Sequence, residues 1–189
     1  MIELDHLFRL VVEPGPVLEA LERGGFRLDE GTRHVGQGTR NRRVNFARTF
    51  FEVLWVDDLE VARANELRLD LRVGDGARSI GVCWRGDVAG AFGDQLWLHH
   101  PPYMPTLAIH LRRDEPTGPL HFGFQRETPE DRERHWPANR QGMDPRLLEH
   151  PNGAREITSW RIDGATLVVA LHGLSAVVEA PRVVRFEPE

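Results

Sequence analysis

The stretch from Ile2 to Val12 constrains the fold more than any other part of the sequence. Side chains alternate along it, with apolar positions and His6 on one face and with Asp5 and Arg9 on the other. This period of two predicts a β-strand. The face of Asp5 and Arg9 also carries apolar residues, so the strand is expected to be buried on both sides and to need packed elements against each face.

A short helix and further strands follow this first strand. Pro14 and Pro16 suit the first turn of a helix, where the missing N–H is not needed, and Gly24-Gly25 supply a C-terminal stop. These signals predict a helix over residues 15–23. The next segments predict an extended run, a glycine-rich loop and a strand region dense in Val and Phe, at residues 26–28, 31–41 and 44–56.

A turn near residue 74 divides the chain. Asp58 is a candidate N-cap of a second helix, and Gly74-Asp75-Gly76 is a strong turn signal before the apolar run from Ser79 to Trp84. Strands are then expected at 95–98 and 106–111, but no helix pattern precedes them. A second copy of the strand, helix and strands order would therefore be abbreviated.

The last part of the chain predicts mainly β-structure. Thr128 and Pro129 predict the start of a short polar helix over 129–136, and residues 137–153 predict an irregular connection with one helical turn around 145–149. Three β-like runs predict a C-terminal β-meander, at residues 156–162, 165–171 and 177–186.

These segments predict an α+β fold in one compact unit. We expect a first module at residues 1–73, an abbreviated second module with its connection at 74–155, and a C-terminal β segment at 156–189.

The composition excludes several kinds of chemistry. The 24 basic residues are all Arg, so no lysine is available for a Schiff base or for the phosphates of a P-loop, and we expect no nucleotide cofactor. Cys83 is the only cysteine, which removes disulfide frameworks and thiolate-rich zinc sites. The formal charge of −5 argues against nucleic-acid binding and favours a small-molecule partner.

The hydropathy pattern gives no sign of a membrane segment. No run approaches the ~18 unbroken apolar residues that a membrane span needs. Asp5 and Arg9 interrupt the apolar stretch at the start of the chain. We therefore expect a cytoplasmic protein that does not contact a membrane.

Four short motifs are informative as an ordered set. They are Leu4-Asp5-His6-Leu7, the segment HVGQGTRN at 34–41, Phe51-Glu52-Val53-Leu54, and Gly74-Asp75-Gly76 before a strand containing Trp84. In this order the chain resembles the glyoxalase-like branch of the vicinal oxygen chelate superfamily over roughly residues 2–85. The resemblance continues less strongly through MPTLAIH at 104–110 and HPNGA at 150–154.

The resemblance implies paired βαβββ modules forming a cupped mixed sheet, and a divalent metal bound by one His and one Glu from each module. His6 and Glu52 match the pair of the first module, and Glu52 is also the catalytic candidate. An imidazole and a carboxylate together suit Zn²⁺, Fe²⁺, Mn²⁺, Co²⁺ or Ni²⁺. His110 is the candidate third ligand, with His121 and Glu115 in reserve. The strand that opens the second module has no His, so the four-ligand set is incomplete.

Structural alternatives exist for these residues. Without the resemblance, His6 would be a hydrogen-bonded core histidine. Glu52 lies among aromatic and aliphatic residues, so burial would demand a partner, and Arg43 or Arg48 could provide it in place of a metal. His99-His100-Pro101-Pro102 predicts a surface loop and not a metal clamp.

Four further residues are candidates for substrate contact. Thr39 and Asn41 of the glycine-rich loop are expected to fix a turn or to touch substrate. Arg43 belongs to a basic cluster that can clamp an anion. Trp84 can line an apolar cavity, although aromatic residues on strands are more often part of the core.

Two functions follow from this set. The leading hypothesis is a divalent-metal-dependent enzyme of lyase, isomerase or dioxygenase type, in which His6, Glu52 and His110 hold an ion that polarises a small oxygen-rich substrate. The alternative is a metal-free protein of the same fold that binds or sequesters a small molecule. The resemblance also implies a homodimer, because modules of this fold often pair across chains.

Overall fold

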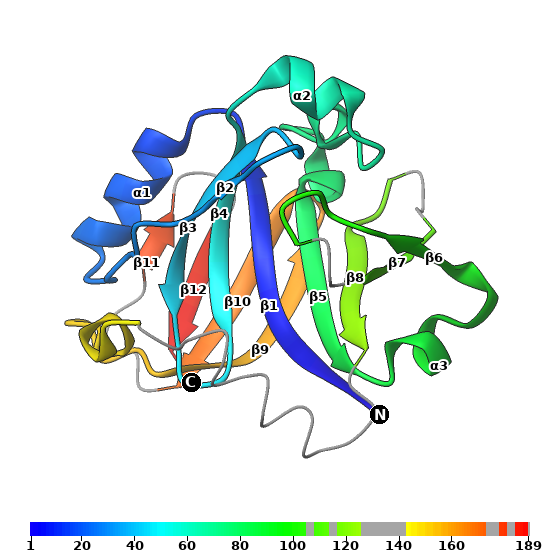
Figure 1. Ribbon diagram of the computed structural model, residues 1–189. Helices are drawn as coiled ribbons and strands as arrows, with labels where there is room; N and C mark the ends of the chain where they lie inside the picture. Colours follow the sequence, from blue (N-terminus) through cyan, green and yellow to red (C-terminus); the bar gives the residue numbers. More distant parts are fainter. Residues whose placement is uncertain (105–107, 114–116, 126–142, 173–177, 181–183, 189) are drawn as a thin grey trace.

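Two βαβββ modules lie side by side in one strongly curled mixed sheet of eight strands (Figure 1). The computed structural model describes residues 1–104, 108–113, 117–125, 143–172, 178–180 and 184–188. This architecture confirms the α+β fold of paired modules that the sequence predicts.

Module one contains a strand, a helix and three further strands: β1 (Ile2–Val11), α1 (Pro14–Arg23), β2 (Arg33–His34), β3 (Thr39–Asn45) and β4 (Phe50–Val56). β1 pairs with β4 in parallel, and β4, β3 and β2 continue the sheet in antiparallel pairs. The helix expected at 15–23 is confirmed. It has proline in its first turn and ends at Gly24 and Gly25, where Phe26 N–H bonds to the carbonyl of Leu21 at 3.0 Å.

Module two repeats the same order, with a shorter first strand and a shorter helix: β5 (Ile80–Gly86), α3 (Val88–Phe92), β6 (Leu96–His99), β7 (Ile109–Arg112) and β8 (Leu120–Gln125). β5 pairs with β8 in parallel, as β1 does with β4. The sequence did not predict α3, because five residues with Gly90 among them carry no helical period. The Asp87 side chain caps this helix by accepting from Gly90 N–H at 2.9 Å, and Val88 and Phe92 are buried.

The segment between the modules and the glycine-rich loop differ slightly from expectation. As expected, Asp58 caps α2 (Leu59–Ala64), accepting from Val61 N–H at 3.1 Å. Short 3₁₀ helices occur at Leu69–Leu71, Gly76–Ser79 and Gly93–Gln95. Residues 26–28 form no strand, and Thr39–Asn41, expected in a loop, begin β3.

The order of strands across the main sheet is β2-β3-β4-β1-β5-β8-β7-β6. The antiparallel pairing of β1 with β5 joins the modules at the centre. β1 is therefore a central strand, in agreement with the burial on both faces that its sequence predicts.

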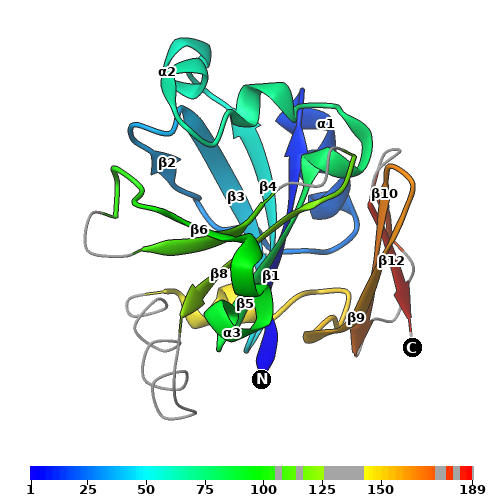
Figure 2. The same cartoon turned by 90° about the vertical axis from the view of Figure 1, so that its right-hand side faces the viewer.

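A second sheet of four strands contains the C-terminal elements β9 (Glu156–Asp163), β10 (Thr166–His172), β11 (Val178–Ala180) and β12 (Val184–Pro188). Figure 2 shows it as a separate layer beside the main sheet. Its order is β11-β12-β10-β9, with β12 parallel to β10. In a simple meander β11 would pair with β10. Instead, the third predicted β run, at residues 177–186, contains two strands, and the second of them, β12, lies between β10 and β11.

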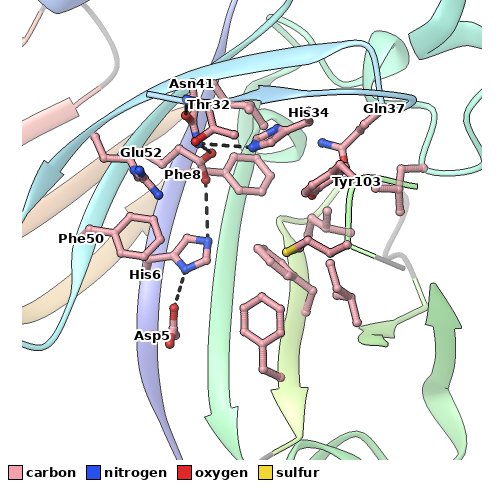
Figure 3. Close-up of a pocket in the computed structure, with 18 of the residues that line it drawn as sticks. Asp5, His6, Phe8, Thr32, His34, Gln37, Asn41, Phe50, Glu52 and Tyr103 are labelled. Atoms are coloured by element: carbon pink, nitrogen blue, oxygen red, sulfur yellow. Dashed lines mark hydrogen bonds and ion pairs between the residues drawn. The ribbon is translucent and has the colours of Figure 1, made fainter. Parts of the chain in front are cut away.

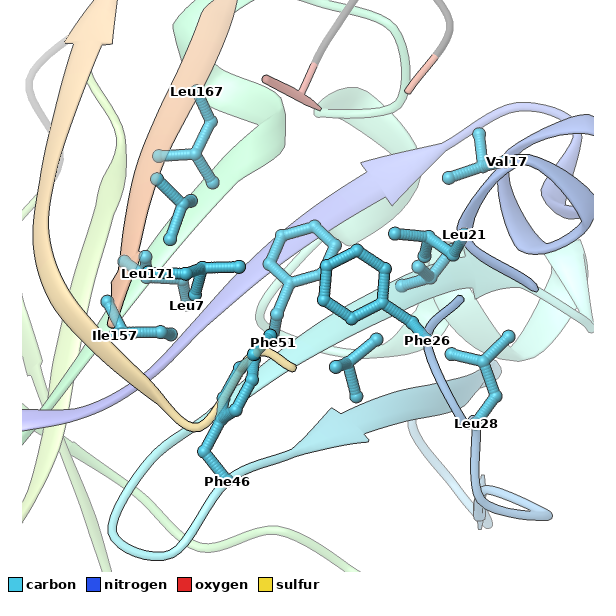
Figure 4. Close-up of a cluster of buried hydrophobic side chains, with 14 of the residues drawn as sticks. Leu7, Val17, Leu21, Phe26, Leu28, Phe46, Phe51, Ile157, Leu167 and Leu171 are labelled. Carbon is cyan, nitrogen blue, oxygen red and sulfur yellow. The ribbon is translucent and has the colours of Figure 1, made fainter. Parts of the chain in front are cut away.

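The main core lies between the outer face of the curled sheet, helix α1 and the second sheet (Figure 4). Leu7 and Phe51 of the main sheet meet Leu21 of α1 and Leu167 of β10, and all four side chains are fully buried. Burial of apolar area on this scale is the main force that holds the two sheets together.

The expected helix at 129–136, and most of the connection before residue 143, lie outside the described residues. The helical turn expected at 145–149 is present as a 3₁₀ helix, Pro145–Leu148. Within the described residues, no helix has the length and apolar character that crossing a membrane requires.

His150 fixes the connection between module two and the second sheet. Its Nδ1 accepts from Arg27 N–H at 3.0 Å, and its Nε2 lies 3.0 Å from the carbonyl of Asn45, to which it donates. This arrangement requires the neutral imidazole with its proton on Nε2. The rings of Phe26 and Phe46 meet it edge-on.

We predict that His150 makes the protein less stable in acid. Burial lowers the pKa of His150 below the ordinary value of 6.5, so the unfolded chain takes up a proton at higher pH than the folded protein does. The contribution of His150 to stability is therefore fully present above about pH 6.5, and it declines as the pH falls toward the lowered pKa. Urea unfolding across this range should show the decline, and His150→Gln should reduce it.

The matched control is His100→Gln, since His100 is exposed. This substitution should leave the decline unchanged. Equal slopes for the wild type and the His150→Gln variant would contradict the assignment.

Candidate functional site

A cavity of about 380 Å³ lies on the inner face of the curled sheet (Figure 3). Both modules line it, and the loops at the two edges of the sheet meet beside it. There the ring of His34 stacks on Tyr103 with centroids 4.7 Å apart, and Gly36 packs so closely against Pro102 that a Cβ would lie 2.7 Å from the proline. A cavity of this size suits a small molecule.

Strand alternation in module one places polar side chains on the cavity wall. β3 directs Asn41, Arg43 and Asn45 inward, while Val44 joins the main core. β4 directs Glu52 inward, between Phe50 and Leu54. The Glu52 side chain is buried, as its apolar neighbours in the sequence indicate.

A β-bulge in β1 brings two adjacent polar residues to the cavity. Leu4 pairs with Trp84 and His6 pairs with Cys83, so Asp5 is the extra residue on this strand. Asp5 and His6 consequently both line the cavity, whereas a regular strand would have pointed them to opposite faces.

Hydrogen bonds and an ion pair link four buried side chains into a chain (Figure 3). Asp5 Oδ1 lies 2.7 Å from His6 Nδ1, and His6 Nε2 lies 3.7 Å from Glu52 Oε2. The other oxygen of Glu52 accepts from the amide of Asn41 at 2.5 Å. Asp5 thus orients the His6 ring by accepting from Nδ1–H, which turns Nε2 toward Glu52.

The arginines that were candidate partners of Glu52 have other partners. Arg43 Nε bonds to Asp29 Oδ2 at 2.6 Å, and Arg48 lies 3.7 Å from Glu3. Among the described residues, Glu52 instead accepts a hydrogen bond from Asn41 and lies beside His6.

His34 and Tyr103 complete the polar side of the cavity. Thr39 Oγ1 lies 2.9 Å from His34 Nδ1 and accepts from Gln37 at 2.8 Å, so Thr39 supports His34 from behind and does not line the cavity itself. Burial lowers the pKa of His34, against the opposing effect of Glu52. Burial, with a smaller effect of Glu52, raises the pKa of Tyr103 well above its usual value, so its hydroxyl keeps its proton.

Strands β7 and β8 of module two contribute an apolar wall. Ile109 and Leu111 of β7 face the cavity, and β8 adds a stripe of three side chains, Leu120, Phe122 and Phe124. The Phe8 ring lies directly over Gly81 of β5, where a Cβ would lie 2.0 Å from the ring. Glycine at this position makes room for the ring.

Several candidates from the sequence lie elsewhere. His110 stands between two cavity-lining residues of β7 and so belongs to the opposite face. Trp84 and His121 meet on the outer face, where the indole Nε1 donates to His121 at 3.2 Å and Trp84 packs near Trp160. Glu115 lies outside the described residues. Of the proposed set, His6, Glu52, Asn41 and Arg43 line the cavity together.

The donor atoms present match half of the metal site that the resemblance implies. His6 Nε2 and Glu52 Oε2 lie close together, but the inner faces of β5 and β8 offer glycine, a cysteine and apolar side chains in the corresponding places. Asp5, His6 and Cys83 do have ligand atoms within 4.8 Å of one another. Burial raises the pKa of the Cys83 thiol well above its usual value, and neither β5 nor β8 supplies the second His and Glu of the implied set. The four-ligand set therefore does not fit this chain.

Three polar residues that line the cavity were not predicted from the sequence to do so. His34 was part of a motif without an assigned role, Tyr103 had no distinguishing pattern, and His99 was assigned to a surface loop. His99 ends β6 and is 1% exposed. The alternation of β6 could have placed it, had the strand been extended by one residue.

Comparison with known proteins identifies the family. Residues 4–178 match the model of a glyoxalase-like domain. The chain therefore belongs to this family, which confirms the glyoxalase-like resemblance seen in the sequence. A search of curated proteins found no match.

Two solved structures are similar to this chain. A hypothetical protein from Staphylococcus aureus matches with a TM-score of 0.52 and 12% identity over 100% of both chains. Methylmalonyl-CoA epimerase from Mycobacterium tuberculosis matches with a TM-score of 0.42 and 16% identity over 67% of this chain and 89% of that one. At the identity of the first match, the likeness concerns the fold alone.

We predict that Asn41 and Glu52 are energetically coupled. Asn41→Leu removes the donor to Glu52 and the acceptor of Thr32 N–H, a 2.6 Å bond, and should lower the free energy of unfolding by about 1–3 kcal/mol. Combined with Glu52→Gln in a double-mutant cycle, it should show a coupling energy of about 0.5–3 kcal/mol in urea unfolding.

Asn65→Leu is the control for this cycle, because Asn65 donates to the carbonyl of Gly36 and not to Glu52. Its effect should add to that of Glu52→Gln. A coupling energy of zero for Asn41 would show that the short contact does not hold the carboxylate.

Proposed function

We propose that this protein binds small, neutral molecules that have a hydrogen-bonding end and an apolar body, and that it does so without a metal. The observation that carries the proposal is the uneven lining of one cavity, in which most polar side chains belong to module one and the cavity-facing side chains of β7 and β8 in module two are apolar. Pockets that orient a ligand combine a few polar groups with a larger apolar surface in this way. Members of the superfamily that sequester small molecules supply the precedent.

The charges on the polar wall favour a neutral ligand. Glu52 brings a carboxylate to the cavity that no arginine is shown to pair with among the described residues, while the charge of Arg43 is matched by Asp29 and that of Asp5 by Arg85. A ligand carboxylate would meet repulsion there in a poorly solvated site. A hydroxyl group can instead donate to Glu52 and accept from Asn41, which makes phenols and alcohols the favoured chemical class.

The composition of the second wall supports binding without metal. A bound divalent ion at His6 and Glu52 would draw its remaining protein ligands from module two, where the inner faces of β5 and β8 carry Cys83 as their only candidate ligand. Two protein ligands alone make a weak site.

A divalent-metal-dependent enzyme is the second candidate, and one feature favours it. Asp5 holds Nδ1 of His6 and Asn41 holds Oε1 of Glu52, as outer-shell groups do around metal ligands. In that case His6 and Glu52 would hold the ion, and the ion would supply Lewis-acid chemistry of lyase, isomerase or dioxygenase type.

Metal analysis combined with calorimetry separates the two candidates. We expect far less than stoichiometric Zn, Fe, Mn, Co or Ni in protein purified after growth with each metal. We also expect 4-methylphenol to bind equally well with and without a chelator. The carboxylate probe 4-methylbenzoate should bind at least about tenfold more weakly, because of repulsion by Glu52.

Two variants sharpen the result. Glu52→Gln should reduce the difference in Kd between the two probes. Glu60→Gln, at an exposed residue, should leave that difference unchanged. Near-stoichiometric metal that is lost in both His6→Ala and Glu52→Ala would overturn the proposal in favour of the enzyme.

A further inference from the structure

A second histidine, His99 of module two, lines the same cavity and is paired with a carboxylate of module one, Glu66. His99 lies at the end of β6, and its Nδ1 contacts Glu66 Oε1. In the main sheet β6 is separated from β1, which carries His6, by β5, β8 and β7. The two histidines therefore approach the cavity from different walls.

Glu66 determines which nitrogen of His99 carries the proton. Its carboxylate accepts from Nδ1, so in the neutral imidazole Nε2 has the unshared electron pair and acts as a hydrogen-bond acceptor. The Glu66 side chain is 56% exposed, whereas that of His99 is 1% exposed. The pair thus has an outer end in solvent and an inner end at the cavity.

His99 Nε2 is buried and has no hydrogen-bond partner among the described residues. Buried polar atoms nearly always have a partner, so an orphan at the wall of a cavity requires an explanation. The His99 ring meets Trp97 edge-on, with 6.1 Å between the ring centroids. A phenylalanine could make the same contact without burying an unpaired nitrogen, so packing alone does not account for a histidine at this position.

We infer that Glu66 and His99 form a second polar recognition point, which accepts a hydrogen bond from a hydroxyl or N–H group on the apolar body of the ligand. The inference rests on the proposed function and specifies its ligand. One end would bind at His6 and Glu52, the middle would pack on side chains such as Phe8 and Phe122, and a second donor group would bond to His99. The ligand class is therefore a compact molecule with donor groups at two separated points.

A pair of matched probes tests this inference. 4-(Hydroxymethyl)phenol has a hydroxyl group where 4-methylphenol has only a methyl group, and both can place the phenol at the polar wall. Calorimetry with the wild type should give a lower Kd for the hydroxymethyl compound. In His99→Phe the ratio of the two Kd values should shift by about fivefold in favour of the methyl compound, because one neutral hydrogen bond is lost.

Two further variants keep the test independent of any folding defect in His99→Phe. His99→Gln puts an amide near the position of Nε2 and should retain part of the preference. Glu66→Gln removes the carboxylate that fixes the tautomer and should weaken the preference, while thermal unfolding confirms that each variant folds.

Each outcome has a definite meaning. Equal Kd values for both probes in the wild type, or an unchanged ratio in His99→Phe, would overturn the inference while leaving the proposed function intact. Failure of the wild type to bind either probe would overturn the proposed function, and the inference with it.

Discussion

The pairing of β1 with strands of both modules is the constraint on which the rest of the structure depends. β1 lies parallel to β4 of its own module and antiparallel to β5 of the other, so it joins two sheets into one. Its outer face carries Leu7 into the core shared with the second sheet, and its inner face carries Phe8 into the cavity. The bulge at Asp5 adds the one irregularity that the site requires, because it aims Asp5 and His6 at the same space.

The two modules share a topology and differ in chemistry. Module one lines the cavity with a network of Asn41, Glu52, His6 and Asp5, while module two lines it mainly with apolar side chains, His99 and Tyr103 excepted. The two modules thus share one topology, but the pocket between them is asymmetric. That asymmetry argues against a metal shared between the modules and in favour of a ligand with distinct ends, since each wall solvates one kind of group well.

Local patterns predicted the elements well, and long-range geometry limited the rest. The strand at His6, helix α1 and the strand around Glu52 follow from periodicity and end signals. The resemblance paired His6 with Glu52, and their side chains lie 3.7 Å apart. Alternation alone could not decide which face of β7 points inward, and His110 lies on the other one. His99 reaches the cavity only because the sheet curls. The three segment boundaries, the homodimer and the cytoplasmic location stay predictions.

Methyl-resolved NMR of the protein with bound 4-methylphenol tests the central claim most directly, because leucines occur on both faces of the curled sheet. The account predicts shifts at the methyl groups of Leu54, Leu111 and Leu120, which line the cavity, and intermolecular contacts from the ring to them. The methyl groups of Leu7 and Leu167, buried on the outer face, should not shift. Shifts confined to that outer core, or absent from both sets at saturating probe, would contradict a two-walled binding cavity.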